Sequence, residues 1–146
     1  MIGRVITPST LRRRITSHFL MNGDERMGKT NIYYLWVTTG DQPLGGTDSN
    51  VFVQLFGTEG KTESIYLPPE DIFAFEQGSV DKFILEVPDL GNLTRCCIGH
   101  DATADSGWYV ENVRVRDDET DREWLFVFNQ WLGVEEAGTL AACAEC

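Results

Sequence analysis

The sequence predicts an all-β protein, an antiparallel sandwich of about eight short strands. Apolar residues recur at every second position in short blocks from Asn31 onward, which is the period of a strand with one buried face. Turn-forming Gly, Pro, Asn and Asp residues separate the blocks. The 146 residues suffice for one domain with its own core, and almost none of them show helical periodicity.

The predicted strands follow one another at short intervals. They cover residues 31–39, 51–56, 61–67, 81–87, 93–100, 108–115 and 123–128, with a last short piece at 130–132. The first block is rich in aromatic and β-branched residues, and in the second Val51, Val53 and Leu55 occupy alternate positions. The turns between blocks lie at 40–46, 57–60, 88–91, 102–107 and 117–121. The segment 69–75 alone resembles a helical turn, because proline stands at its start and acids follow.

Charge divides the chain into a basic start and an acidic body. Residues 1–30 carry six basic residues and two acids, a net of +4, whereas residues 31–146 carry six and 21, a net of -15. We therefore expect a flexible basic arm or linker at 1–30, a domain at 31–134 and a tail at 135–146. The acidic body repels phosphates, so no nucleic acid is expected as a partner.

The composition also bears on where the protein resides. No apolar run approaches the roughly 20 residues that cross a bilayer. We expect an intracellular protein, cytoplasmic or peripheral at a membrane. Up to Asn22 the arm holds arginines and hydroxyl residues but no acid, so organelle targeting by residues 1–22 is an alternative to a plain leader.

The cysteines and the catalytic motifs argue against a metal cluster and against an enzyme. Cys96 and Cys97 are neighbours on a predicted strand and point to opposite faces, and the single pair Cys143 and Cys146 is a weak zinc motif. We expect reduced thiols, with one of Cys96 or Cys97 in the core. A catalytic histidine would have to be His100, and no nucleophile elbow, phosphate-binding glycine loop or HExxH motif is present.

Two acidic loops that contain glycine, 39–50 and 99–107, could bind a hard cation. Calcium takes six to eight oxygen ligands from carboxylates, amides and backbone carbonyls, and glycine lets carbonyls turn inward. Neither loop has the spacing of an EF-hand. The alternative is a pair of ordinary turns in which Asp and Asn side chains cap local backbone groups.

Four stretches of sequence between residues 31 and 133 resemble the PLAT domain, also called the lipoxygenase homology or LH2 domain. They are TGDQPLGGTDSNVFVQLFG, FEQGSVDKFILEVPDLGNL, IGHDATADSGWYVENVRVRD and FVFNQWL, in the order of the family. Their sequences are most similar to those of the repeated modules of lipoxygenase-homology-domain proteins. The resemblance implies a sandwich of two four-stranded antiparallel sheets and a noncatalytic module that docks on membranes or proteins.

The resemblance also implies candidate calcium ligands. Those of a first site are Gly45, Gly46, Thr47, Asp48, Asp101 and Asp105, and those of a second site, present in some relatives, are Asp71 and Glu76. Leu44 stands where some calcium-binding relatives have an acid. The family aromatics matched by Phe83, Trp108 and Trp131 mostly pack in the core.

The expected function is calcium-assisted docking on membrane lipid. Apolar side chains at loop tips would contact the membrane, and the candidates are Pro43, Leu44, Ile72 and Phe73. The alternative is a protein-interaction module in a structural, cytoskeletal or ciliary-type assembly. A third interpretation is an accessory regulator of a lipid-modifying enzyme.

Overall fold

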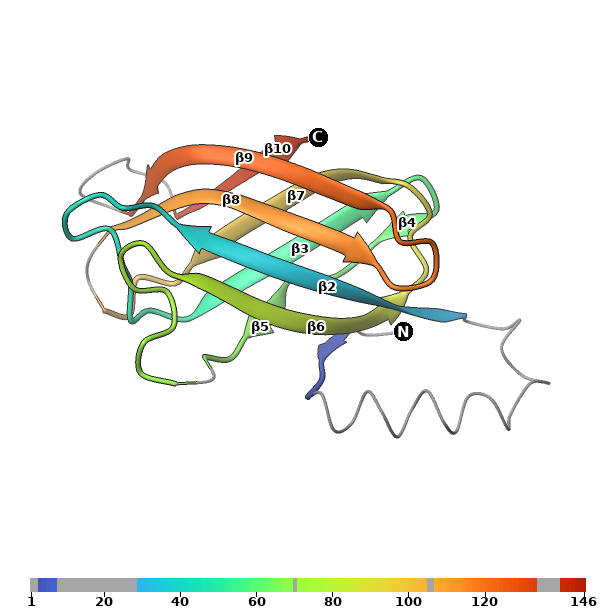
Figure 1. Ribbon diagram of the computed structural model, residues 1–146, viewed down its shortest axis with the longest axis horizontal. Helices are drawn as coiled ribbons and strands as arrows, with labels where there is room; N and C mark the ends of the chain where they lie inside the picture. Colours follow the sequence, from blue (N-terminus) through green and yellow to red (C-terminus); the bar gives the residue numbers. More distant parts are fainter. Residues whose placement is uncertain (1–2, 8–28, 70, 105–106, 134–139) are drawn as a thin grey trace.

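The computed structural model describes residues 3–7, 29–69, 71–104, 107–133 and 140–146. This part of the chain contains ten strands and no helix, arranged as two antiparallel five-stranded sheets that pack face to face (Figure 1). The predicted fold class, an all-β antiparallel sandwich, is therefore confirmed, although each sheet has five strands rather than the four that the resemblance implies. The described part of the chain has no helix that is long and apolar enough to span a bilayer.

The first sheet has the strand order β1-β6-β2-β8-β9. Its strands are β1 Arg4–Val5, β6 Val80–Pro88, β2 Thr30–Thr39, β8 Trp108–Asp117 and β9 Glu123–Leu132. Burial along the central strand β2 alternates at every residue, as the sequence pattern predicts. The short block predicted at 130–132 is the end of β9 rather than a separate strand.

The second sheet has the order β10-β7-β3-β4, and β5 pairs with the same strand β3. Its strands are β10 Ala141–Glu145, β7 Leu93–His100, β3 Val51–Gly57, β4 Gly60–Lys61 and β5 Ile65–Leu67. The predicted strand 61–67 is split because the Thr62 hydroxyl enters the ladder. Its Oγ1 accepts a hydrogen bond from the backbone N–H of Leu55 (3.0 Å).

Strand β10 brings residues of the predicted tail into the sandwich. The side chains of Ala142 and Ala144 pack against the core, although the segment lacks the large apolar residues that mark a strand in a sequence. Gly99 on β7 leaves the room that this approach requires, since a Cβ there would lie 2.6 Å from the carbonyl oxygen of Leu140. The predicted arm likewise contributes β1, at the edge of the first sheet. Segments before and after the predicted domain 31–134 therefore each add a strand to the sandwich.

The helical turn expected at 69–75 does not form over residues 71–75, which the structure describes. Residues 71–75 make turns instead, and Phe75 adopts a positive φ of 59°, which an α-helix does not allow. The Asp71 carboxylate accepts a hydrogen bond from the backbone N–H of Phe73 (2.8 Å), so this acid caps a turn rather than a helix.

The aromatic residues expected in the core largely lie there. Trp108 is fully buried and Phe83 is nearly so. Trp131 is half-buried at the sheet surface, where it meets Tyr109 edge to face at 5.4 Å between ring centroids. Asp81 fixes the loop before β6, because its Oδ2 accepts hydrogen bonds from the N–H of Phe75 (2.8 Å) and the hydroxyl of Ser79 (2.9 Å).

The expectation of reduced thiols is wrong for two of the four cysteines. Cys97 and Cys143 form a disulfide, and their Cα atoms are paired across β7 and β10. Cys96 is buried in the core, as expected for one of the adjacent pair, and burial raises the pKa of its thiol. Cys146 is free and exposed. The sequence did not predict this bond, because its two cysteines are 46 residues apart.

Removing the disulfide should destabilise the sandwich. We expect Cys143→Ser to lower the free energy of unfolding by about 2–4 kcal/mol, because the bond closes a long loop in the unfolded chain. Cys146→Ser, three residues along the same segment, is the matched control and should unfold like the parent protein. Urea unfolding of both variants gives the comparison, and equal stability of the two would contradict the disulfide.

Candidate functional site

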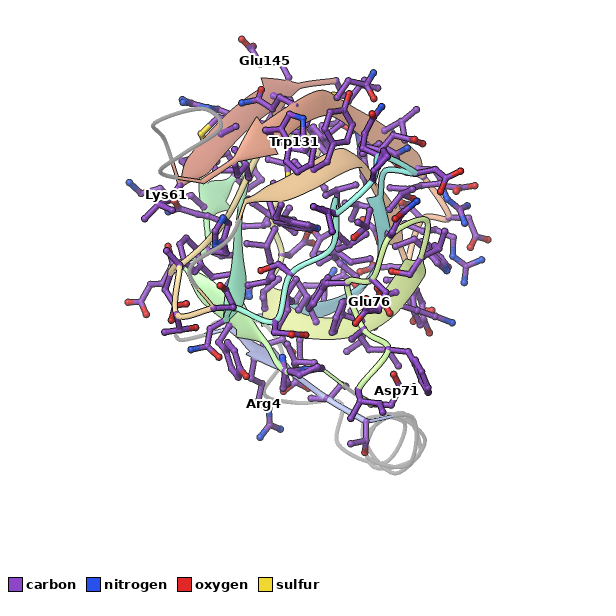
Figure 2. The ribbon with its side chains drawn as sticks, turned by 90° about the vertical axis from the view of Figure 1, so that its left-hand side faces the viewer. Arg4, Lys61, Asp71, Glu76, Trp131 and Glu145 are labelled. Carbon is purple, nitrogen blue, oxygen red and sulfur yellow. A yellow bond between two sulfur atoms is a disulfide. The ribbon has the colours of Figure 1, made fainter. Side chains whose placement is uncertain are left out.

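Three loops meet at one end of the sandwich, onto which Figure 2 looks. They are 40–50 before β3, 71–79 before β6 and 101–107 before β8, the last without residues 105 and 106. Figure 2 labels Asp71 and Glu76 in the second loop and Trp131 across the end from them. Residues of both predicted calcium sites therefore lie at this end.

The loop 40–50 is fixed on both sides by backbone hydrogen bonds. The N–H of Tyr109 donates to the carbonyl of Gly45 (2.8 Å), and the N–H of Thr47 donates to the carbonyl of Phe75 (2.9 Å). Gly46 has no space for a side chain, since a Cβ would lie 2.8 Å from the carbonyl oxygen of Phe75. Gly46 thus permits the close approach of the loops 40–50 and 71–79.

An open hollow of about 570 Å³ lies where the loops 40–50 and 71–79 meet. Its lining includes three carboxylate side chains, Asp48, Asp71 and Glu76. The side chain of Ile72 and the hydroxyl residues Thr47 and Ser49 also line it, so oxygen donors and apolar surface face the same space. The structure thus brings Asp48 of the predicted first site together with the acids of the predicted second site.

The donor set of this hollow suits a hard cation, because calcium is bound by carboxylate, hydroxyl and carbonyl oxygens. Within the described residues, however, no three His, Cys, Asp or Glu side chains are grouped closely enough to hold a metal ion. A cation would therefore have to draw the three carboxylates closer together. Their position at loop ends, rather than inside strands, allows such movement.

Asp101 does not line the hollow, and its carboxylate is already hydrogen-bonded to other groups. Its Oδ2 accepts a hydrogen bond from the Asn50 amide (2.7 Å), and its Oδ1 accepts one from the Thr103 hydroxyl (2.8 Å). These bonds lower the pKa of Asp101 to about 2, that from Asn50 contributing most. Asp101 thus ties the loop 101–107 to the start of β3. Asp105, its expected companion, lies outside the described residues.

The apolar residues proposed for membrane contact lie at the surface of this end. Leu44 is 88% exposed, Ile72 81% and Phe73 68%. Pro43, beside Leu44, is exposed as well. Leu44 also has a φ of 61°, a left-handed conformation that costs a non-glycine residue roughly 1–2 kcal/mol. Large apolar side chains are thus exposed to water in the loop 40–50 and in the loop 71–79, and that of Ile72 lines the hollow itself.

His100 is fully buried and both of its ring nitrogens have partners. Its Nε2 lies 2.7 Å from the carbonyl oxygen of Leu132, and its Nδ1 accepts a hydrogen bond from the N–H of Ala102 (3.1 Å). This pattern requires the neutral ring with its proton on Nε2. A histidine held in this way supports the loop 101–107 and is not available as a general base.

Comparisons with known proteins agree with this architecture. The model of the PLAT/LH2 domain family matches residues 33–142. Lipoxygenase homology domain-containing protein 1 of Mus musculus is 42% identical over 101 residues, which are 68% of this chain and 5% of that protein. The polycystin family receptor for egg jelly of Mus musculus is 33% identical over 108 residues, 73% of this chain and 5% of that protein.

A solved structure shares the fold. A coral 8R-lipoxygenase, described as calcium-activated through a C2-like domain, matches with a TM-score of 0.68 and 24% identity, covering 78% of this chain and 16% of that one. At this level of identity the match concerns the fold alone. In these longer proteins the matched segment is a small part of the whole, so what they do as whole proteins is not transferred to this chain.

The hydrogen bonds of Asp101 predict a pH-dependent stability. Its pKa is lowered in the folded state, from 3.8 to about 2. The stabilisation is therefore complete above the unfolded value and is lost as the pH falls through about 2. We expect Asp101→Asn to melt at a lower temperature than the parent at neutral pH, with the difference narrowing between about pH 4 and pH 2.

The same bonds can be tested through Asn50, since its amide is the largest cause of the shift. In Asn50→Ala, we expect the Asp101 carboxyl to titrate at a higher pH than in the parent, measured by carbonyl NMR. A parent titration midpoint at or above 3.8 would contradict the hydrogen-bonding pattern.

Proposed function

Because the chain belongs to the PLAT/LH2 domain family, we propose that it is a noncatalytic module that docks on membrane lipid with the assistance of calcium. One observation carries the proposal: the carboxylates of Asp48, Asp71 and Glu76 line the same hollow, and the exposed apolar side chain of Ile72 lines it with them. This pairing of acids with apolar tips suits a surface that meets lipid only after its charge has been neutralised.

Calcium would be held by the three carboxylates together with oxygens of the loop 40–50. It would supply the positive charge that an acidic protein lacks, since residues 31–146 carry a net charge of -15. An anionic bilayer repels such a surface until a cation bridges or neutralises it. The ion's role would be electrostatic, and no bond is made or broken.

The apolar tips would provide the favourable free energy of docking. Burying each side chain in the membrane contributes roughly 1.5–3 kcal/mol, so Leu44, Ile72 and Phe73 together suffice for reversible binding. The left-handed conformation of Leu44 supports a role for this residue, because strained positions that persist in a structure are concentrated at functional sites.

The second candidate is a protein-interaction module in a structural, cytoskeletal or ciliary-type assembly. It is supported by relatives in which the matched segment forms 5% of a much longer chain, as in lipoxygenase homology domain-containing protein 1. A role as accessory regulator of a lipid-modifying enzyme stays a third proposal, which only the sequence resemblance supports.

The disulfide bears on the cellular location that we propose. An intracellular place was expected from the sequence, yet structural disulfides persist mainly in oxidising compartments. The Cys97–Cys143 bond therefore favours docking on a membrane surface that faces such a compartment.

Liposome sedimentation tests calcium-assisted docking. We expect phosphatidylserine vesicles to retain the protein at millimolar calcium and to release it into chelator. The double variant Asp71→Asn/Glu76→Gln should lose the calcium-dependent fraction, whereas Glu59→Gln/Glu63→Gln, with the same change of net charge elsewhere, should keep it. If no lipid composition retains the protein at millimolar calcium, membrane docking fails. Calcium at about 100 times its Kd should also raise the unfolding free energy by about 2.7 kcal/mol.

Leu44→Gly separates lipid contact from stability. Glycine adopts the left-handed conformation without strain, so the variant should melt at the parent's temperature or slightly above it. Its vesicle binding should nevertheless fall, since the most exposed apolar side chain of the loops is gone. Unchanged vesicle affinity would remove Leu44 from the docking surface.

A further inference from the structure

We propose that the outer face of the first sheet binds an acidic segment of a partner protein that also carries apolar side chains. We call this surface the cation–aromatic face, and its members are Tyr34, Trp36, Lys82, Arg114 and Arg116. It shares no residue with the acidic hollow, and binding at this face would require neither calcium nor lipid.

The centre of the face is Trp36, on the outward side of the central strand β2. In the sheet register Trp36 is paired with Lys82 of β6 on one side and with Arg114 of β8 on the other. The Lys82 ammonium lies 5.4 Å from the Trp36 ring centroid, and the Arg114 guanidinium lies 4.0 Å from it. The indole is thus flanked by two cations within cation–π distance.

Tyr34 repeats this arrangement one step along β2. The Lys82 ammonium and the Arg116 guanidinium each lie 5.0 Å from the centroid of its ring. The rings of Tyr34 and Trp36 are themselves 6.3 Å apart. Lys82 therefore contacts both rings, and the five side chains form one continuous surface rather than separate pairs.

The positive charge of the face stands out in an acidic protein. Residues 31–146 contain only six basic residues, and three of them, Lys82, Arg114 and Arg116, lie here. Lys82 forms no ion pair with any residue that the structure describes. Among the described residues its charge is met by the rings of Tyr34 and Trp36 and by no carboxylate, so it can bind an external carboxylate.

The two arginines have internal acids, but their pairing is incomplete. Arg114 bonds Glu123 at 2.7 Å, in a pair whose side chains are both nearly half exposed. Arg116 reaches Asp121 only at 3.7 Å, and its Nε is buried with no hydrogen-bond partner in the described part of the chain. Exposed pairs of this kind contribute little, so an incoming carboxylate can replace them at small cost.

Apolar side chains surround the cations. Val80, Leu125 and Val127 are each about half exposed, although large apolar residues in an antiparallel sheet usually face the core. In the register Leu125 lies opposite Arg114, and Val127 lies opposite Asn112. Tryptophan, tyrosine and arginine, set among apolar contacts, are the residues that dominate the energetics of protein–protein interfaces.

This composition favours a protein segment over a lipid headgroup. The cations lie on β6 and β8, on either side of β2, whereas a single phosphate is held by donors that converge on it. An anionic bilayer laid on the face would also meet the acids at its border, Glu123 and Asp121. A peptide can place its own acids opposite the cations and its apolar residues opposite Val80, Leu125 and Val127.

A displayed library of random dodecapeptides, selected on the immobilised protein in chelator, tests the proposal. We expect the enriched peptides to combine Asp or Glu with large apolar residues. A fluorescein-labelled member of the enriched set should then bind about tenfold or more weakly to Lys82→Gln/Arg114→Gln than to the parent, because both central cations are gone. Added salt should weaken the parent's binding as well.

The second sheet provides a matched control. Lys61 and Arg95 also lie over an aromatic ring, that of Phe56, at 5.9 and 5.3 Å. Lys61→Gln/Arg95→Gln removes the same charge from the opposite face and should bind the labelled peptide like the parent. If Lys82→Gln/Arg114→Gln melts early, Lys82→Gln alone replaces it, since Lys82 has no ion pair to lose among the described residues.

Three results would overturn the proposal: no enrichment, enrichment without excess acids, or equal peptide binding by the two double variants. A fourth would assign the face to lipid instead: phosphatidylserine vesicles in chelator that bind the parent but not Lys82→Gln/Arg114→Gln, with no peptide enriched. Because every arm contains chelator, failure here leaves calcium-assisted docking untouched, and failure of that docking leaves this face untouched.

Discussion

The burial of Trp108 is the interaction on which the arrangement of the loop end depends. Its indole N–H donates to the Thr39 hydroxyl (2.9 Å), next to the loop 40–50. Its ring meets Phe75 edge to face at 5.6 Å, in the loop 71–79, and His100 at 6.3 Å, beside the loop 101–107. One fully buried side chain thus contacts the root of each loop, and its partner Phe75 also lines the acidic hollow.

The distribution of charge follows from the same architecture. Acids can gather at the loop end because the loops leave their side chains in water, as with Asp48, Asp71 and Glu76. The outer face of the first sheet places long basic side chains beside outward aromatic rings, where the methylene stems pack and the charges stay solvated. The net charge of -11 is therefore the sum of unevenly placed charges, with acids at the loop end and three cations on the cation–aromatic face.

The sequence predicted the strands with strong alternation, because burial on one face leaves a local record, as along β2. It did not predict β10, whose alanines carry no such record and whose position depends on the distant residues Gly99 and Cys97. The meeting of Asp48 with Asp71 and Glu76 also depends on tertiary contact. Alternation in β2 does place Tyr34 and Trp36 on the outer face, but only the strand order shows that Lys82 and Arg114 flank them.

Membrane docking and protein interaction need not compete, because the two proposals use different surfaces. Ile72 and Phe73 belong to the loop 71–79 at the loop end, so a bilayer that contacts them meets this end of the sandwich. The cation–aromatic face lies on the outer side of the first sheet. Val80, one of the apolar residues beside it, stands at the start of β6, where the loop 71–79 ends. A protein docked by its loop tips would leave most of that face in water. The module would then hold an acidic partner beside the membrane, with calcium controlling only the membrane contact.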